Sequence, residues 1–249
     1  MEVVIVLGGP NTKEDIKALL ENRYGKAYED FRFVGVDGGA LRLLDQHLPM
    51  EVAIGDFDSV TKEQRDLIHE AAGTVVQLPS EKDDTDFEAA LLWVKEHYEG
   101  VPIHVLGSFG GRVDHAISTL WTMMRPDLAP LIPYVVFEDA TNVVNFIQPG
   151  TYTIEKMDFT KYLSFISMTA VENVTLVDVK YTLDSKSYAY PVALVSNEFT
   201  SDKMTISFTK GLILVAQTRD HWRENKTAHF VRCFFFFTKS YEIPKFTYK

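Results

Sequence analysis

The pattern of hydrophobic and polar positions changes near the middle of the chain. In the first half, short apolar runs alternate with longer stretches whose apolar residues recur at helical spacing. The apolar runs, which predict buried strands, cover residues 3–7, 33–36, 52–54, 74–78 and 103–106. The stretches between them predict helices over residues 12–22, 40–47, 61–72, 85–98 and 114–124. This alternation predicts a parallel sheet with helices on both faces.

The second half lacks the helical pattern. Short apolar runs separated by turn-forming residues predict strands over residues 134–138, 143–147, 152–154, 162–168, 174–181, 204–208 and 212–217. Many short strands with turns between them are typical of a β-sandwich or a small barrel. We therefore expect an α/β domain over residues 1–128 and an all-β domain over residues 129–220.

The last segment, residues 221–249, differs from both halves. It carries six Lys or Arg against two Glu, and four consecutive phenylalanines at 234–237 that do not alternate as in a one-sided strand. We treat it as an atypical tail: an added strand, an interaction segment, or a frame-shifted or read-through end.

Composition narrows the class of protein. The chain has 249 residues, a formal net charge of -10 and 46% hydrophobic residues, enough for a substantial core. The acidic balance argues against nucleic acid or an anionic membrane as partner. A single cysteine fits a reducing compartment. The opening MEVVIVLG has no basic segment and predicts a strand, and no apolar run approaches the roughly 20 residues of a membrane span, so we expect the cytosol.

The sequence GDFDS at residues 55–59 directly follows a predicted strand. In extended backbone, residues i and i+2 point the same way, so Asp56 and Asp58 are expected to face one point and bind a metal. The alternative is an acidic turn in which Asp58 or Ser59 caps the next helix.

The sequence DDTD at residues 83–86 precedes an amphipathic helix. An Asp or Thr at this place is a common helix cap, and acidic residues in the first turn complement the helix dipole. Four consecutive oxygen-bearing side chains exceed what capping requires. Because carboxylates this close repel one another, a hard cation such as Mg2+ carrying phosphates would suit them.

The sequence GSFGGRVDH at residues 107–115 is a glycine-rich turn between a predicted strand and helix. Glycines such as Gly110 and Gly111 let backbone N–H groups approach phosphate oxygens, and Arg112 offers a planar fork for phosphate. Asp37-Gly38-Gly39 repeats this strand–turn–helix form. The alternative is a structural turn in which Asp114 caps the helix.

Taken in order, these motifs are similar to those of the bacterial-type thiamine pyrophosphokinase family. The resemblance continues at QPG (residues 148–150) and VSNEF (residues 195–199), and it ends near residue 220. It implies an α/β catalytic domain followed by a β-sandwich, assembled as a homodimer. It also implies transfer of a pyrophosphoryl group from ATP to the hydroxyethyl oxygen of thiamine, with release of AMP.

The resemblance also implies roles for individual residues. Asp56, Asp58 and Asp86 match positions that bind Mg2+ and phosphate, with Asp37 and Asp84 close by as candidates to position or deprotonate the thiamine hydroxyl. The matching nucleotide-lining positions are Thr85, Arg112 and Asp114, and we add Gly38, Gly110 and Gly111 from their turn chemistry. Ser196 and Asn197 match the segment that meets thiamine across the dimer interface. Arg112 and the N–H groups of the glycine turn are expected to stabilise transition-state charge. Asp86 is expected to act in catalysis through Mg2+, which neutralises charge on the polyphosphate.

Two other functions remain open from the sequence. One is a nucleotide- or thiamine-sensing module without catalysis. The other is a different Mg2+-dependent nucleotidyltransferase or glycosyltransferase that uses Asp56 and Asp58.

Overall fold

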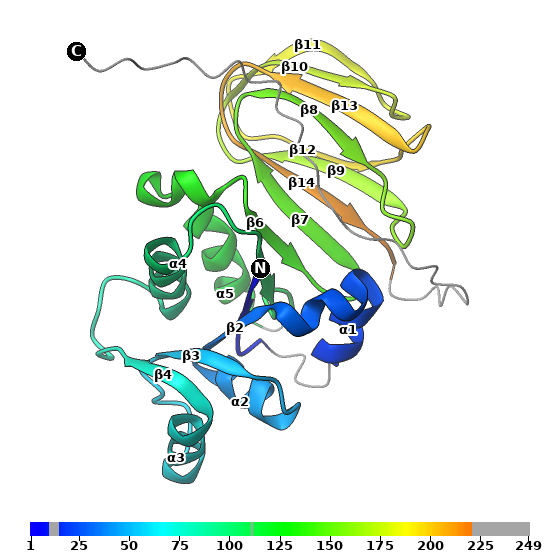
Figure 1. The fold of residues 1–249 in the computed structure, drawn as a ribbon. Coiled ribbons are helices and arrows are strands. Elements are labelled where there is room, and N and C mark those ends of the chain that lie inside the picture. The colour runs from blue at the N-terminus through cyan, green and yellow to red at the C-terminus, as the bar shows by residue number, and fades with distance from the viewer. Residues whose placement is uncertain (10–14, 111, 221–249) are drawn as a thin grey trace, which may run out of the picture.

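The computed structural model describes residues 1–9, 15–110 and 112–220. It consists of an α/β unit with a β-sandwich packed at one end (Figure 1). The predicted fold class is therefore confirmed. Gly111 and residues 221–249 lie outside the described residues, and so does the prediction for the atypical tail.

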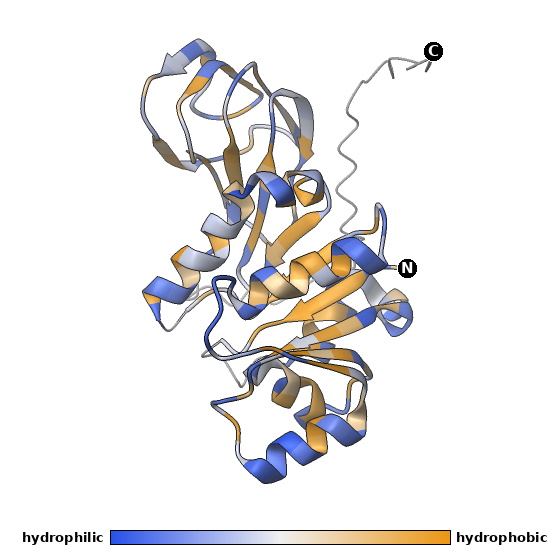
Figure 2. Ribbon diagram, turned by 90° about the vertical axis from the view of Figure 1, so that its left-hand side faces the viewer, coloured by the Kyte–Doolittle hydropathy of each residue, from blue (hydrophilic) through white to orange (hydrophobic). Residues whose placement is uncertain are grey.

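Parallel strands form the centre of the α/β unit. In sheet order they are β6 (Val135–Glu138), β5 (Ile103–Leu106), β1 (Val3–Val6), β2 (Arg32–Val36), β3 (Met50–Gly55) and β4 (Ala72–Gln77). Most of these strands are buried on both faces, which explains their unbroken apolar runs. Figure 2 shows them as the most hydrophobic part of the molecule.

Helices cover the two faces of this sheet. One face packs against α1 (Ile16–Tyr24), α2 (Gly38–Asp45) and α3 (Lys62–Ala71). The other packs against α4 (Asp86–His97), α5 (Val113–Trp121) and the 3-10 helices η2 (Thr122–Met124) and η3 (Pro126–Leu131), while η1 (Gly25–Asp30) follows α1. No helix within the described ranges is both long and apolar enough to cross a bilayer.

The strand order reverses direction beside β1. Successive strands β2, β3 and β4 are added on one side of β1, whereas β5 and β6 lie on its other side. At such a reversal the connecting segments diverge to opposite faces and leave a crevice outside the carboxyl ends of the strands. The topology therefore places a binding crevice at the ends of β1, β2 and β5.

The β-sandwich shares its first sheet with the α/β unit. β7 (Asn142–Ile147) pairs antiparallel with β6, and β14 (Ile213–Thr218), β9 (Tyr162–Ser167) and β12 (Ala193–Asn197) extend the sheet, so that the described residues give it ten strands. The facing sheet contains β11 (Leu183–Tyr188), β10 (Val171–Val177), β13 (Lys203–Phe208) and β8 (Gly150–Glu155). A separate hydrophobic core fills the space between the two sheets.

Two details differ from the sequence-based expectation. The run at residues 134–138 was expected among the strands of the second domain, but β6 pairs parallel with β5 and completes the parallel sheet. β11 and β12 were not predicted, because β11 is largely exposed and its sequence LDSKSY offers little apolar alternation. The domain boundary at residues 128–129 stays a prediction.

A buried cluster of charged groups ties α1 to β5 and β6. The Glu138 carboxylate, 1% exposed, pairs with Arg23 and accepts a hydrogen bond of 2.8 Å from the Tyr24 hydroxyl. His104 lies between Glu138, 3.0 Å from Nδ1, and Glu2, 2.8 Å from Nε2. Burial alone would lower the pKa of His104, but its hydrogen bonds to the two carboxylates raise that pKa to about 9.

We predict that this histidine makes stability depend on pH. Its folded-state pKa of about 9 exceeds the ordinary value of 6.5, so between these values the folded state holds a proton that the unfolded chain releases. The free energy of unfolding should therefore fall as pH rises through this range, by up to about 1.4 kcal/mol per pH unit. Urea unfolding of the wild type and of His104→Gln at several pH values measures this, and equal slopes in both proteins would contradict it.

Candidate active site

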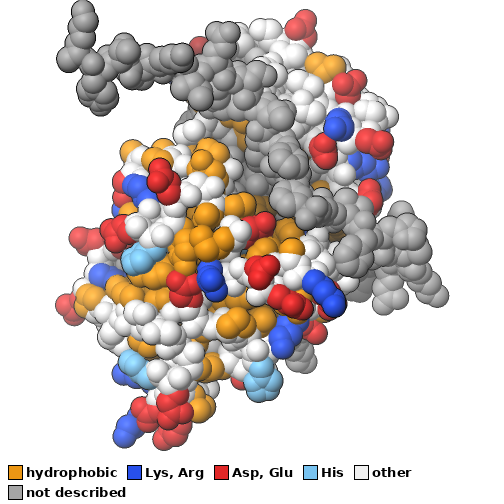
Figure 3. Space-filling view, viewed as in Figure 1, with side chains coloured by type: hydrophobic (Ala, Val, Ile, Leu, Met, Phe, Trp, Pro, Cys, Tyr) orange, Lys and Arg blue, Asp and Glu red, His pale blue; other side chains and the backbone are white. Residues whose placement is uncertain are grey.

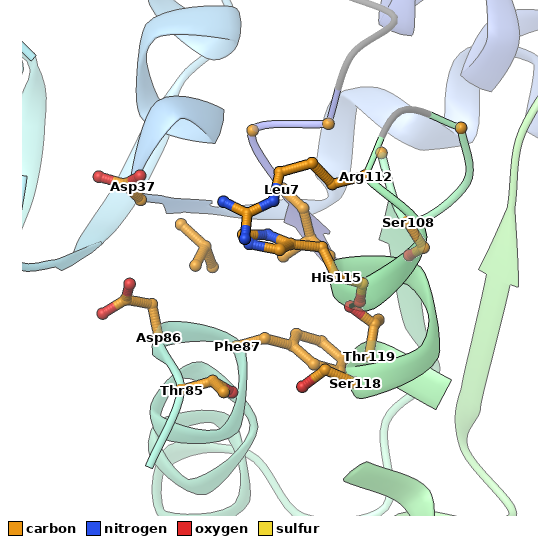
Figure 4. Close-up of a pocket in the computed structure, with 15 residues that line it drawn as sticks. Leu7, Asp37, Thr85, Asp86, Phe87, Ser108, Arg112, His115, Ser118 and Thr119 are labelled. Carbon is orange, nitrogen blue, oxygen red and sulfur yellow. Dashed lines mark hydrogen bonds between the residues drawn. The ribbon is translucent and has the colours of Figure 1, made fainter. Parts of the chain in front are cut away.

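A cavity of about 460 Å³ opens at the crevice that the topology predicts. This size lies within the usual range for small-molecule sites. The residues that line it come from the ends of β1, β2 and β5, the start of α4, and α5 with the turn before it (Figure 4): Leu7, Gly8, Gly9, Val36, Asp37, Thr85, Asp86, Phe87, Gly107, Ser108, Gly110, Arg112, His115, Ser118 and Thr119.

Asp37 is held in the cavity by an uncommon backbone conformation. Its φ of +47° turns the chain from β2 into α2, and its N–H donates to the Ile54 carbonyl at 2.9 Å. Its Oδ2 accepts a hydrogen bond from the Ser59 hydroxyl at 3.1 Å, while the buried Oδ1 has no hydrogen-bond partner among the described residues. Burial raises the pKa of Asp37, and the nearby charges of Asp86 and Asp56 raise it further.

Asp86 and Asp56 come together from the start of α4 and the end of β3. Asp86 begins α4, where the Thr85 side chain caps the helix through a reciprocal hydrogen-bonded box with Glu88. Asp56 directly follows β3. The Lys82 ammonium joins them, 2.9 Å from Asp86 Oδ1 and 3.6 Å from Asp56 Oδ2. Both carboxylates are therefore within reach of one cation.

The carboxylate oxygens at this site are ligands of the type that Mg2+ binds. No three His, Cys, Asp or Glu side chains in the described part of the chain already stand in the arrangement of an assembled metal site. Asp37, Asp56 and Asp86 nevertheless supply the oxygen ligands that Mg2+ prefers. Asp37 also brings the unpaired Oδ1 described above, a buried acceptor that a cation would satisfy.

Two of the predicted carboxylates are placed differently. The extended geometry expected for residues 56–58 is not observed, because the buried Phe57 has a φ of +53° and leaves Asp58 exposed. Asp84 pairs with Arg125 and is not among the residues that line the cavity. The roles assigned to Asp58 and Asp84 stay predictions.

Positive charge enters the cavity from the side opposite the carboxylates. Figure 4 shows Arg112 and His115 facing Asp37 and Asp86 across the cavity. The exposed Arg112 guanidinium holds Asp114 through both carboxylate oxygens, at 2.6 and 3.2 Å, and this pairing lowers the pKa of Asp114 to about 2. Arg112 is thus oriented at the start of α5, where backbone N–H groups add positive potential.

Comparison with known proteins identifies the same family in both halves of the chain as the sequence motifs do. A model described as "Thiamin pyrophosphokinase, catalytic domain" matches residues 28–133, and one described as "Thiamin pyrophosphokinase, vitamin B1 binding domain" matches residues 151–213. The chain is 32% identical over 218 residues to the thiamine pyrophosphokinase of Bacillus subtilis, covering 87% of this chain and 98% of the relative. The chain belongs to the thiamine pyrophosphokinase family.

Solved thiamine pyrophosphokinase structures show the same fold. A family protein from Enterococcus faecalis superimposes with a TM-score of 0.80 at 33% identity, covering 88% of this chain and 100% of that one. The Bacillus subtilis structure gives a TM-score of 0.70 at 30% identity, again over 88% and 100% of the two chains.

The two residues expected to meet thiamine lie far from the cavity of their own chain. Ser196 and Asn197 end β12, which is separated from β1 by β9, β14, β7, β6 and β5. At roughly 4.8 Å per strand, this separation is on the order of 30 Å. Ser196 is exposed, whereas the Asn197 side chain is buried and hydrogen-bonds both the N–H and the carbonyl of Tyr181 at 2.9 Å.

Sequence analysis missed several groups that line this cavity. His115 and Thr119 lie four residues apart on α5 and face the cavity with Ser118 and Phe87 (Figure 4). Their helical spacing from Arg112 is the signal that would have found them. The Ser108 hydroxyl is buried and has no hydrogen-bond partner among the described residues, and no sequence pattern singled it out.

Glycines let the strand ends approach closely enough to form this crevice. A Cβ on Gly39 would lie 1.8 Å from the Val6 carbonyl oxygen, and one on Gly9 would lie 2.1 Å from the Gly107 carbonyl oxygen. A Cβ on the neighbouring Gly38 would meet nothing nearer than the Gly8 Cα at 3.4 Å.

We therefore predict opposite outcomes for two adjacent substitutions. Gly39→Ala should destabilise the protein by about 3 kcal/mol, because the methyl group would push α2 away from β1. Gly38→Ala should stay within about 1 kcal/mol of the wild type, because the space is open and alanine favours the helix. Urea unfolding of both variants measures the difference. Similar stability of the two would show that this backbone contact does not constrain the crevice.

Proposed function

We propose that this chain transfers a pyrophosphoryl group from ATP to the hydroxyethyl oxygen of thiamine, giving thiamine diphosphate and AMP. The observation that carries the proposal is that Asp37 and Asp86 face Arg112 across one crevice of a thiamine pyrophosphokinase fold, with Asp56 joined to Asp86 through Lys82. In this reaction the thiamine oxygen forms a bond to the β-phosphorus, and the bond between that phosphorus and the oxygen bridging to the α-phosphate breaks.

The carboxylates are proposed to serve the polyphosphate through Mg2+. Asp56 and Asp86 would hold the ion, with Asp37 and the predicted Asp58 beside them. When bound, Mg2+ neutralises charge on the polyphosphate. Of the two candidate bases, Asp37 is favoured over Asp84, because Asp37 lines the cavity whereas Asp84 is held by Arg125.

The opposite wall is proposed to bind the nucleotide. Arg112 and Gly110 line the cavity, which supports a role for them in stabilising charge that develops on the phosphates. Thr85 lines the same cavity, and Asp114 orients the Arg112 fork. Gly38 and Gly111 are proposed for the same role from their turn chemistry.

A homodimer in the cytosol completes the proposal. The distance of β12 from the cavity supports a partner subunit supplying Ser196 and Asn197 to the thiamine site. An exposed apolar row on α5, formed by Val113, Ile117 and Trp121, begins next to the cavity-lining Arg112 and suits a subunit contact. Basic and acidic side chains are interspersed on the face in Figure 3, which gives no support to a nucleic-acid partner there.

Removing a carboxylate that is proposed to hold Mg2+ should slow the reaction. Asp56→Asn and Asp86→Asn should each lower the rate of thiamine diphosphate formation by about a hundred-fold or more. Each variant would lose a carboxylate that holds Mg2+, and the charge on the polyphosphate would then no longer be neutralised. Mass analysis of products from ATP, Mg2+ and thiamine measures this, with Asp66→Asn on the exposed face of α3 as matched control. Thiamine monophosphate with ADP would overturn the proposed bond cleavage, and thiamine binding without any product would indicate a sensor.

A charge on the apolar row of α5 should prevent assembly. Ile117→Lys should shift the protein from dimer to monomer and remove thiamine turnover, because a charge would be buried in the subunit contact. Sedimentation velocity measures the state of assembly, and Leu67→Lys, at an exposed apolar position on α3, is the control. Full turnover by a monomer would contradict the shared thiamine site.

A further inference from the structure

Lys82 occupies an unusual place among the ion-paired lysines of this protein. Its ammonium lies 2.9 Å from Asp86 Oδ1 and 3.6 Å from Asp56 Oδ2, and it also donates to the Pro79 carbonyl at 3.1 Å. Its side chain is only 16% exposed, compared with 51–66% for the paired lysines 180, 203 and 210. The ammonium is therefore a partly enclosed cation rather than a surface partner.

The Lys82 ammonium lies between carboxylates whose mutual repulsion requires a nearby cation. Asp37 and Asp86 line the same cavity, and Lys82 joins Asp86 to Asp56, so three carboxylates share one small region. Among the ion pairs of the described residues, Lys82 is the only Lys or Arg that pairs with Asp56 or Asp86. Without it, repulsion between these partly buried carboxylates would disfavour the closed arrangement of the β3 and β4 ends with α4.

We propose that Lys82 is an intramolecular counter-ion, which holds Asp56 and Asp86 together until a divalent cation with its polyphosphate takes its place. This inference rests on the metal-binding role proposed above for the two aspartates. On displacement, the Lys82 ammonium gives up the carboxylate oxygens and, because its side chain stays tethered beside the cavity, it becomes available to the incoming phosphate oxygens.

A counter-ion role and a purely structural role of Lys82 lead to different expected measurements. A neutral residue at this position should affect two measurements in opposite directions. Without a divalent cation the protein should become less stable, because the carboxylates lose their counter-ion. Divalent cations should bind more tightly, because no ammonium competes for the same oxygens. A lysine that only braced the loop through Pro79 would lower stability and weaken or leave unchanged the affinity for the metal.

The test uses the full chain and Mn2+ as the probe, with free and bound ion distinguished by its magnetic resonance signal. Lys82→Met is the principal variant, Lys82→Ala a second neutral variant, and Lys82→Arg keeps the charge. Lys62→Met, at an exposed lysine on α3, is the matched control. The melting temperature is measured in chelator, and the Mn2+ dissociation constant is measured without nucleotide.

We expect Lys82→Met and Lys82→Ala to melt about 2–4 °C lower than the wild type in chelator. We also expect them to bind Mn2+ about three- to ten-fold more tightly, a change of roughly 0.7–1.4 kcal/mol. Lys82→Arg and Lys62→Met should stay near the wild type in both measurements. Unchanged or weaker Mn2+ binding by both neutral variants, or an unchanged melting temperature, would overturn the counter-ion role.

A parallel measurement separates this proposal from the proposed function. If Asp56→Asn and Asp86→Asn lose Mn2+ binding while the Lys82 variants do not tighten it, only the counter-ion proposal fails. If the aspartate variants bind Mn2+ as the wild type does, the metal site itself is wrong, and the counter-ion proposal falls with it.

Discussion

The backbone of β1 runs so close to its neighbours at the carboxyl end of the sheet that side chains are excluded beside it. The methyl group of an alanine at Gly39 or Gly9 would overlap a carbonyl oxygen of Val6 or Gly107. This approach brings the starts of α2 and the β5–α5 turn to the same crevice, so Asp37 and the Arg112 turn face one cavity. The positions of the chemical groups follow from this backbone contact.

The structure contains two clusters of partly or fully buried charged side chains, which differ in how completely their charges are paired. On the face of the sheet that α1 covers, the buried Glu138 carboxylate pairs with both Arg23 and His104, so that opposite charges compensate one another. In the crevice, Asp37 keeps an acceptor atom without a partner among the described residues, and Asp56 and Asp86 share a single lysine. The first arrangement is typical of a structural site, and the second leaves capacity to bind a ligand.

The sequence predicts the elements well where burial is two-sided or where a helix has a clear apolar stripe, as in β1 and α4. It predicts β11 poorly, because an exposed strand carries almost no hydrophobic signal. It places Asp37 and Asp86 at the right edge of the sheet, because strand ends in a parallel sheet share one edge. It does not predict the turn at Phe57 or the pairing of Asp84 with Arg125, since both depend on contacts between segments distant in the chain.

The join between β6 and β7 has a consequence for motion during turnover. These strands are neighbours in one hydrogen-bonded sheet, so the α/β unit and the sandwich share a continuous backbone ladder. Opening them as two bodies about a hinge would break that ladder. Within one chain, access to the crevice is therefore expected to depend on loops and side chains around it rather than on a hinge between the two units.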